Sequence, residues 1–399
     1  MGFYIPTKKL PNLHLYKYSS VDKSLVSKYI LQPYWTWLVE WVPRWVAPNL
    51  VTLTGLMLIV VQVLLLLARD PRMDREDTPA WMFYAWGLSL FMYQSLDAID
   101  GKQARRTGTS GPLGEMFDHG CDAINTTLVA LLSAKAMHLG ESWSTVAGLY
   151  AALASFYLST WEEYYTGTLY LSYVSGPVEG ILMLVSVFFL TGYLGSSFWV
   201  RSLQTFNSSL PNVPLNDVLV GLTLAMVIPN ALSSISSVKK ARASKGKGLR
   251  GAMISLLPFM ILPALGVTWL ACSPTLLREH LVPFILYQSA TFNLGVGRVI
   301  TAHTTKMPFP RTNLATLPMV FGAVNAAMTH LGRTAWMPLE YEGMYMVACA
   351  VFAWAAYSHF VLDVVGSVCK YLDIYCLTIK HRRDNEAGRS TVIKERKAQ

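Results

Sequence analysis

The sequence has little charge and few cysteines for its length. Only 14% of its 399 residues are Asp, Glu, Lys or Arg, and 53% are hydrophobic. Soluble domains carry about 25% charged residues, so the composition excludes an ordinary soluble domain and predicts an integral membrane protein. The five cysteines, Cys121, Cys272, Cys349, Cys369 and Cys376, have no metal-ligand spacing. They therefore predict no disulfide framework.

The first residues lack the apolar core of a signal peptide, and Pro6 stands where a myristoylation motif has Ser or Thr. Membrane residence is therefore expected from internal segments. The net charge of +9 is compatible with nucleic-acid binding, but the basic residues mostly lie in short links and tails between apolar segments. That distribution follows the positive-inside rule, so no nucleic-acid partner is expected.

Apolar stretches of about twenty residues, enough to cross the hydrocarbon core, recur along the chain. We predict an all-α integral membrane fold with about ten transmembrane helices, at roughly residues 48–68, 81–101, 112–138, 145–166, 177–195, 215–238, 252–272, 281–303, 313–332 and 343–367. Before them, Tyr34, Leu38, Trp41 and Trp45 recur at helical spacing, which favours an N-terminal amphipathic helix in the membrane interface over a soluble helix packed on the body.

The charge of the links predicts the topology. One set is basic, with Lys102, Arg105 and Arg106 in one link and a run from Lys239 to Arg250 in another, whereas the opposite links are mixed or acidic. Both termini should therefore face the cytosol. The basic run could bind anionic lipid, but a role as topology determinant is the simpler interpretation.

Four aspartates stand beside the second and third spans. Asp97 and Asp100 are three residues apart and Asp118 and Asp122 are four apart, so each pair shares one face of a helix. Four carboxylates at a membrane need compensating charge, which two divalent cations would supply. Ligation by oxygen favours Mg²⁺, or Mn²⁺, over zinc. Such a site suits displacement at a phosphorus atom; the alternative is a set of interfacial aspartates that cap helix ends.

The stretch from Asp97 to Asp122 reads DAIDGKQARRTGTSGPLGEMFDHGCD. Its spacing of Asp, two residues, Asp-Gly, two, Ala-Arg, eight, Gly, three, Asp, three, Asp is identical to the signature of the class I CDP-alcohol phosphatidyltransferases, and the chain resembles that family. The words DGKQARRT, GPLGEMFDHG, STWEEY and GPVEG are similar to its eukaryotic choline and ethanolamine phosphotransferase branch, especially the fungal members. The resemblance covers most of the chain.

The resemblance implies a reaction and a location. A CDP-linked amino alcohol would be the donor, the hydroxyl of diacylglycerol would attack the phosphorus, and CMP would leave. The protein would be a Mg²⁺-dependent cholinephosphotransferase with two ions, a homodimer in the endoplasmic reticulum membrane with its site facing the cytosol. An ethanolaminephosphotransferase or dual enzyme is the alternative, and a divalent-cation transporter is a distant one.

The resemblance also implies roles for individual residues. The four aspartates match the family's metal ligands, and small or polar neighbours match positions that contact the nucleotide or substrate: Asn49, Gly101, Ala104, Arg105 and Gly114. His119, which follows Asp118, is the expected base for the lipid hydroxyl, because histidine titrates nearest neutrality. Asp122 is the alternative base, and His119 would then only orient Asp118.

Further acids and aromatics are candidates for the same site. Glu179 begins the fifth span and is expected to face the site, holding His119 in its tautomer or polarising the acceptor; the alternative is an acid wetted by the cytosol. Glu162 and Glu163 are expected to be solvated, and Arg298 and His303 either close the cavity or are structural. A trimethylammonium head group would favour an aromatic cage, for which the candidates are Tyr93, Trp161, Tyr164, Tyr165, Tyr170 and Tyr173; membrane-interface packing is the alternative for each.

The predicted organisation has five parts. They are an N-terminal cytosolic and interfacial segment (1–47), a catalytic module of six helices (48–238), a basic cytosolic loop (239–251), four further transmembrane helices (252–367) and a cytosolic tail (368–399).

Overall fold

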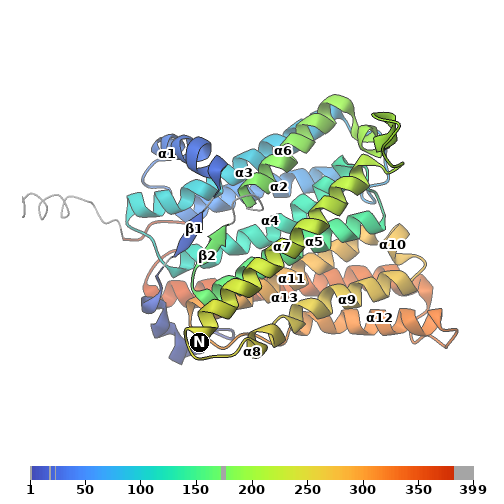
Figure 1. Cartoon of the computed structure of the whole chain (residues 1–399). Coiled ribbons are helices and arrows are strands. Elements are labelled where there is room, and N and C mark those ends of the chain that lie inside the picture. Colours follow the sequence, from blue (N-terminus) through green and yellow to red (C-terminus); the bar gives the residue numbers. More distant parts are fainter. Residues whose placement is uncertain (1, 18, 23, 172–176, 382–399) are drawn as a thin grey trace, which may run out of the picture.

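A computed structural model describes residues 2–17, 19–22, 24–171 and 177–381 of the chain. Long helices lie side by side along one common direction (Figure 1). Tyr173 and the end of the predicted tail, residues 382–399, lie outside the described residues. The helices are α1 (Gln32–Trp41), α2 (Pro48–Arg69), α3 (Ala80–Thr107), α4 (Pro112–Ala136), α5 (Trp143–Thr166), α6 (Pro177–Leu194), α7 (Leu215–Ala243), α8 (Arg250–Ile254), α9 (Leu257–Cys272), α10 (Leu276–Glu279), α11 (Leu281–Thr304), α12 (Leu317–His330) and α13 (Glu342–Leu372).

Each apolar stretch predicted from the sequence contains a long helix. The stretch 252–272 is divided between α8 and α9. By length and composition, four helical segments of the described chain can cross a membrane: Pro48–Arg69, Leu215–Ala243, Arg250–Cys272 and Leu339–Leu372. The other long helices are shorter or more polar, so the all-α membrane fold is established and the total of about ten spans stays a prediction.

Two groups of helices meet along α4 and α11. In the first group α2 and α6 each pack on α3, and all three helices pack on α4. In the second group α11 packs against α13, α5 and α4. Fully buried rings such as Trp86 and Trp161 fill the space between neighbouring helices. These contacts fix α4, which carries half of the aspartates, between the two groups.

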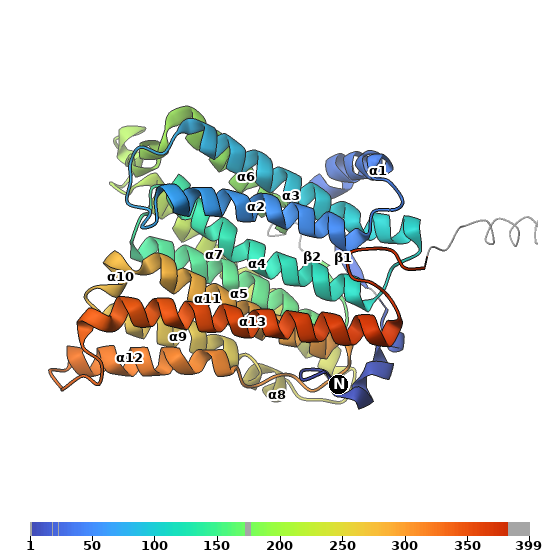
Figure 2. The same ribbon diagram turned by 180° about the vertical axis from the view of Figure 1, so that it is seen from behind.

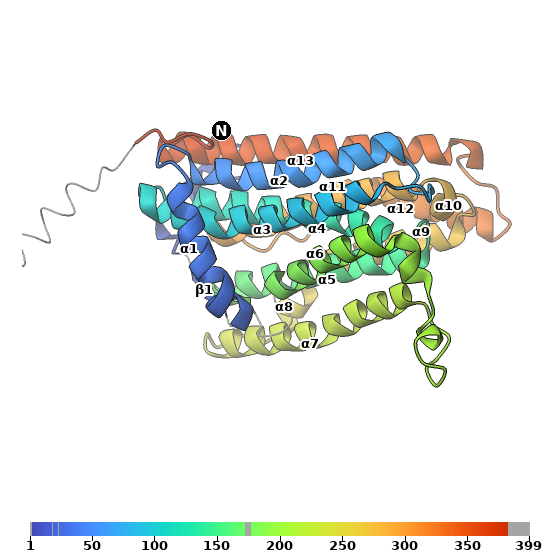
Figure 3. The same ribbon diagram turned by 90° about the horizontal axis from the view of Figure 1, so that it is seen from above.

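The outer face of the bundle is apolar. Helix α7 lies along one edge (Figure 3) and packs mainly on α5. Its Leu224, Ile228 and Leu232 recur every four residues, so they share one helix face, and they are 42%, 64% and 64% exposed. Soluble proteins rarely expose such a continuous apolar surface, whereas lipid tails solvate it without cost. This face of α7 is therefore suited to contact lipid.

The N-terminal helix differs from the predicted one. α1 ends at Trp41, because Val42 precedes Pro43 and takes an extended conformation, so the inclusion of Trp45 in the helix was wrong. Trp35 and Val39 are the residues that α1 buries, while Trp37 and Trp41 are exposed. The helix thus packs on the body with one face and presents aromatic rings on the other, an arrangement that suits the membrane interface.

The links predicted to be basic lie at one end of the bundle. Figures 1 and 2 show the N-terminus, the end of α3, the end of α7 and the end of α13 together at this end. A two-stranded parallel pair joins the N-terminal segment to the body here, with β1 (Ser20–Asp22) beside β2 (Leu169–Leu171). The links 70–79 and 195–214 lie at the opposite end. The charge difference predicted from the sequence therefore separates the two ends of the molecule.

Candidate active site

A tight turn brings the aspartates of α3 and α4 together. α3 ends at Thr107, and the capping residue Gly108 has a left-handed φ of 68°, which suits glycine. The Thr109 N–H donates to the carbonyl of Ala104 at 2.9 Å. α4 then begins with Pro112, whose fixed φ suits the first turn of a helix. The end of one helix therefore faces the start of the next, and their acidic faces meet.

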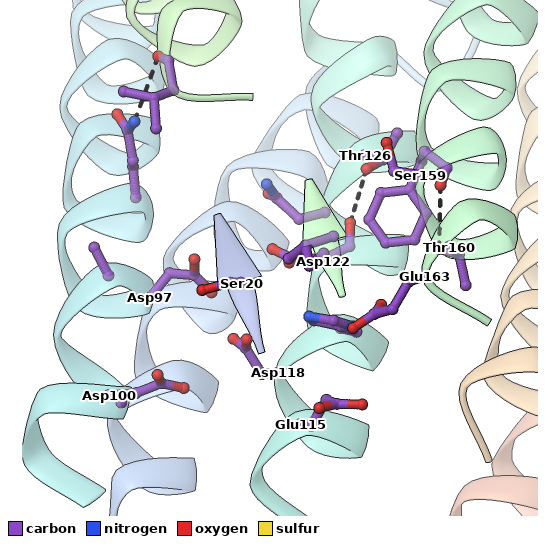
Figure 4. A pocket seen from close by; sticks show the side chains of 18 of the residues that line it. Ser20, Asp97, Asp100, Glu115, Asp118, Asp122, Thr126, Ser159, Thr160 and Glu163 are labelled. Atoms are coloured by element: carbon purple, nitrogen blue, oxygen red, sulfur yellow. Dashed lines mark hydrogen bonds and ion pairs between the residues drawn. The ribbon is translucent and has the colours of Figure 1, made fainter. Parts of the chain in front are cut away.

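Three of the four carboxylates converge closely. Asp97, Asp118 and Asp122 each offer an oxygen atom, and these oxygens all lie within 4.8 Å of one another. Figure 4 shows Asp97 and Asp100 reaching from α3 towards Asp118 and Asp122 on α4. Helical spacing predicted one acidic face on each helix, and the packing of α3 and α4 brings these two faces together.

Hydroxyl groups orient two of the aspartates. Thr52 of α2 donates to Oδ2 of Asp100 at 2.5 Å, and the Tyr93 hydroxyl of α3 donates to Oδ1 of Asp122 at 2.6 Å. Tyr93 is almost completely buried. Each of these two carboxylates is therefore positioned by a hydroxyl group from a neighbouring helix.

The residues present fit a divalent cation. Oδ1 of Asp97 and Oδ1 of Asp118 are buried and have no hydrogen-bond partner. An unpaired buried carboxylate oxygen is costly, and a hard cation would satisfy it. Because the donor set is made of carboxylate oxygens, Asp97, Asp100, Asp118 and Asp122 are the residues that could hold Mg²⁺ or Mn²⁺.

A second acidic cluster lies beside the first. Carboxylate oxygens of Glu115 and Glu163 and a ring nitrogen of His303 lie within 4.8 Å of one another. Nδ1 of His119 is 3.6 Å from Oε2 of Glu163, and the hydroxyl of Tyr16 donates to Glu115. The cluster combines side chains from α4, α5 and α11 with one from the N-terminal segment.

Part of this cluster was not predicted from the sequence. Glu162 and Glu163 are each 5% exposed, so the expectation that they are solvated was wrong. Glu162 accepts a hydrogen bond from Ser234 of α7 at 2.7 Å, whereas Glu163 points to His119. Glu115 was not considered, although it precedes His119 by four residues and so shares its helix face. That spacing was an available signal.

The other predicted site residues lie around the same space. Glu179, at the start of α6, was predicted to hold His119 in its tautomer, but it accepts a hydrogen bond from Ser24. The carboxylate that lies beside His119 is that of Glu163. Asn49 is at the start of α2, and a Cβ on Gly114 would lie 4.0 Å from its Oδ1. One cavity is lined by Asn49, Gly101, Ala104, Arg105, Gly114, His119, Asp122 and Glu179.

Most candidate cage aromatics have structural partners. Trp161 donates to the Ser255 hydroxyl at 3.0 Å, Tyr165 to the same oxygen at 3.0 Å, and Tyr164 to the Met307 carbonyl at 2.8 Å. Of the candidates within the described residues, Tyr170 alone lines the cavity. Arg298 donates to the Thr312 carbonyl, whereas His303 lies beside Glu115 and Glu163, and neither Arg298 nor His303 lines the cavity.

The cavity has a volume of about 2440 Å³ and runs along much of the bundle. Its polar end contains the aspartates, Asn49 and Arg105, and its other end reaches Met137 and Leu139 at the far end of α4. Between these ends the walls are largely apolar side chains of α4, α5, α6 and α7. Met183 of α6 and Leu222 of α7 line it and are 53% and 58% exposed, so the cavity also opens sideways between these helices.

Fold and site define a multi-pass membrane protein with a buried acidic centre at one end of a long cavity. Residues 45–228 match the family model described as CDP-alcohol phosphatidyltransferase. Choline/ethanolaminephosphotransferase 1 of Saccharomyces cerevisiae is 36% identical over 96% of this chain and 100% of its own length. Cholinephosphotransferase 1 of the same yeast is 37% identical over 96% of this chain and 100% of its own length. An uncharacterized class-I family protein of Schizosaccharomyces pombe is 38% identical over 95% of this chain and 98% of its own length. The chain therefore belongs to the CDP-alcohol phosphatidyltransferase family, as the resemblance predicted.

Proposed function

We propose that this protein is a diacylglycerol cholinephosphotransferase, which transfers phosphocholine from CDP-choline to diacylglycerol and releases CMP. One observation carries the proposal: the converging aspartates stand at the polar end of a cavity whose other arm is apolar and opens between α6 and α7. A single site can thus receive a water-soluble nucleotide and a lipid. Relatives named for choline and for choline and ethanolamine are both similar to the chain.

The polar end suits the nucleotide. Gly101, Ala104 and Gly114 leave room for close approach, and no atom other than a distant Arg105 nitrogen, at 3.7 Å, would meet a Cβ on Gly101. Arg105 supplies a guanidinium that can pair with a phosphate oxygen. Bound divalent ions would neutralise the pyrophosphate and hold the attacking and leaving oxygens in line.

The apolar arm suits the acceptor. About 19 residues of α4 separate Asp118 from Met137, which corresponds to about 28 Å of helix, long enough to accompany an acyl chain. Small and polar residues such as Thr126, Ser159 and Thr160 line the arm near the aspartates (Figure 4). The glycerol hydroxyl can therefore approach the acidic centre while its chains stay in an apolar environment.

His119 is the proposed base. It takes the proton of the diacylglycerol hydroxyl as that oxygen forms its bond to the phosphorus attached to choline, and the bond from phosphorus to the oxygen of CMP breaks. Glu163, 3.6 Å from Nδ1 of His119, stabilises the imidazolium that results. Asp122 is the alternative base, but its Oδ1 already accepts a hydrogen bond from Tyr93.

Choline is proposed as the head group because the sequence is similar to a yeast cholinephosphotransferase, and because Tyr170 lines the cavity and offers an aromatic ring to a cation. Dual use of ethanolamine is the alternative. We further propose a cytosolic active site, in keeping with the basic links at the end of the molecule that holds the aspartates. An endoplasmic reticulum location and a homodimer are proposed from the family resemblance alone.

The test is CMP release by the purified full-length protein with dioleoylglycerol, comparing CDP-choline with CDP-ethanolamine, in Mg²⁺ and in chelator. We expect release that needs both diacylglycerol and metal, and a larger kcat/KM for CDP-choline. His119→Ala should lower turnover by about two to four orders of magnitude, whereas His330→Ala, exposed at the far end of α12, should not. No release with either donor from folded protein would refute the proposed reaction; metal transport without CMP release would favour the transporter.

A further inference from the structure

The chain that follows α13 returns to the acidic site. Residues 373–381, here called the C-terminal strap, leave α13 through Asp373, whose φ of 55° is left-handed. The strap then passes the start of α2 (Figure 2). Thr378 forms an antiparallel bridge with Val46, just before α2. More than 300 residues of sequence separate these two positions, so the contact is purely tertiary.

Two contacts place the strap at the nucleotide end of the cavity. Nδ2 of Asn49 donates to Sγ of Cys376 at 3.7 Å. Tyr375, Cys376 and Lys380 line the same cavity as Asn49 and Arg105. Asn49 is a position that the family resemblance assigns to nucleotide contact. The strap therefore forms a wall of the space in which the nucleotide would lie.

The chemistry of this wall suits a nucleoside diphosphate. Lys380 adds a positive charge to the cavity wall, and its Nζ lies 5.4 Å from the centre of the Tyr375 ring. The ring offers a surface for stacking, and the ammonium can pair with phosphate. Asp373 accepts hydrogen bonds from Lys380 and, at 2.9 Å, from His381. These two contacts, here called the clasp, join the start of the strap to its end and so close it into a loop.

We infer that the C-terminal strap is part of the nucleotide-binding site, with Cys376 covered by the bound CDP moiety and Lys380 pairing with its diphosphate. This inference rests on the proposed function, because it requires a cytidine nucleotide in the cavity. The strap lies outside residues 45–228, which the family model matches. It is therefore an addition by the C-terminal half of the chain to the site on α2, α3 and α4.

Alkylation of Cys376 tests the inference without relying on turnover. The full-length protein is treated with N-ethylmaleimide in Mg²⁺, with and without CMP, and modification of each cysteine is followed by peptide mass spectrometry. Burial raises the pKa of the Cys376 thiol, so the reaction is run at about pH 8.5 to supply thiolate. CMP should slow alkylation of Cys376 at least about fivefold. Cys369 on α13, which does not line the cavity, is the internal control.

Variants separate nucleotide binding from a merely structural clasp. Lys380→Ala should raise the KM for CDP-choline about five- to tenfold and leave the KM for diacylglycerol unchanged, as expected when one phosphate contact is lost. Asp373→Asn breaks the clasp but keeps the Lys380 charge, so it should not raise that KM. Lys370→Ala, an exposed lysine on α13, controls for the loss of one positive charge.

The outcomes distinguish the two proposals. If CMP raises the thermal stability of the protein but leaves Cys376 alkylation unchanged, the strap does not contact the nucleotide and the inference is wrong, whatever the turnover. An equal increase in KM for Asp373→Asn and Lys380→Ala also contradicts it, because the clasp alone would then matter. If CMP protects Cys376 but CMP release from CDP-choline is absent, the inference stands and the proposed reaction fails.

Discussion

His119 of α4 and Glu163 of α5 contact each other across the helix interface, with 3.6 Å between Nδ1 and Oε2. Both side chains are buried. Because Nδ1 faces the carboxylate, Nε2 is the nitrogen that stays available for a substrate. A carboxylate in this position fixes the ring orientation and favours the tautomer in which Nε2 can accept a proton. The contact thus links the packing of α4 on α5 to the proposed chemistry.

The first prediction concerns Glu163→Gln. The amide keeps the shape of the side chain but cannot stabilise a charged imidazole, so turnover should fall on the order of 10–100-fold, as it does when a histidine loses its orienting partner. The KM for CDP-choline should change little. Glu162→Gln is the matched control, since Glu162 is equally buried on the same helix but bonds to Ser234. Equal losses in both variants would mean that burial, and not the His119 contact, matters.

A second prediction concerns the metal. Asp97→Ala and Asp118→Ala each remove an unpaired buried carboxylate oxygen from the converging set, so activity should be absent at every Mg²⁺ concentration. Asp217→Ala, exposed at the start of α7, should retain activity. Chelator should inactivate the wild-type protein, and Mg²⁺ or Mn²⁺ should restore activity because the ligands are oxygen atoms. Substantial activity of either variant in saturating Mg²⁺ would contradict the metal assignment.

The acidic residues show which features of the site can be predicted from local sequence and which depend on helix packing. Helical spacing is a local property, so the sequence could predict that Asp97 and Asp100 share one helix face and that Asp118 and Asp122 share another. Glu163 was assigned to solvent because it follows Trp161 near a helix end. Its burial depends on how α5 packs against α4, and no local pattern contains that information.

The strap and α1 likewise have tertiary contacts that the local sequence does not predict. The bridge between Val46 and Thr378 joins two segments that are far apart in the sequence, and nothing in either segment alone predicts it. On α1, aromatic spacing indicated an amphipathic helix, but Trp35 and Val39 form the packed face and Pro43 ends the helix before Trp45. Periodicity thus identified the element, whereas its contacts decided which side is buried.

A third prediction concerns Tyr93→Phe. The change removes the hydroxyl that donates to Asp122 at 2.6 Å and leaves the ring in place. Asp122 then loses a partner that orients it, so the Mg²⁺ concentration for half-maximal activity should rise about tenfold. Tyr84→Phe on the same helix is the control, because the Tyr84 ring is exposed and packs on Phe189, away from the aspartates. An unchanged Mg²⁺ dependence in Tyr93→Phe would show that this hydrogen bond does not position a metal ligand.

The last prediction concerns pH and Glu141, in the link between α4 and α5. The pKa of Glu141 is raised to about 7, mainly by burial and also by the nearby Asp74 carboxylate, while Arg72 opposes the rise. Oε1 of Glu141 is buried without a hydrogen-bond partner. A folded-state pKa above the unfolded value means that the contribution to stability is present below the unfolded pKa and is lost as pH rises through about 7. Above that pH the carboxylate is charged beside Asp74 in a poorly solvated position.

Glu141→Gln should therefore raise the apparent Tm of the protein in detergent at pH 8 and leave it nearly unchanged at pH 5. The side chain is only partly buried, so solvent screening reduces the effect, and we expect a gain of about 1–3 °C. Glu340→Gln, exposed at the same end of the molecule, should show no such pH dependence. Melting curves of the two variants and the wild type between pH 5 and 8 measure the difference directly. A gain for Glu141→Gln that is the same at both pH values would show that the amide stabilises by hydrogen bonding and that the titration of Glu141 contributes nothing.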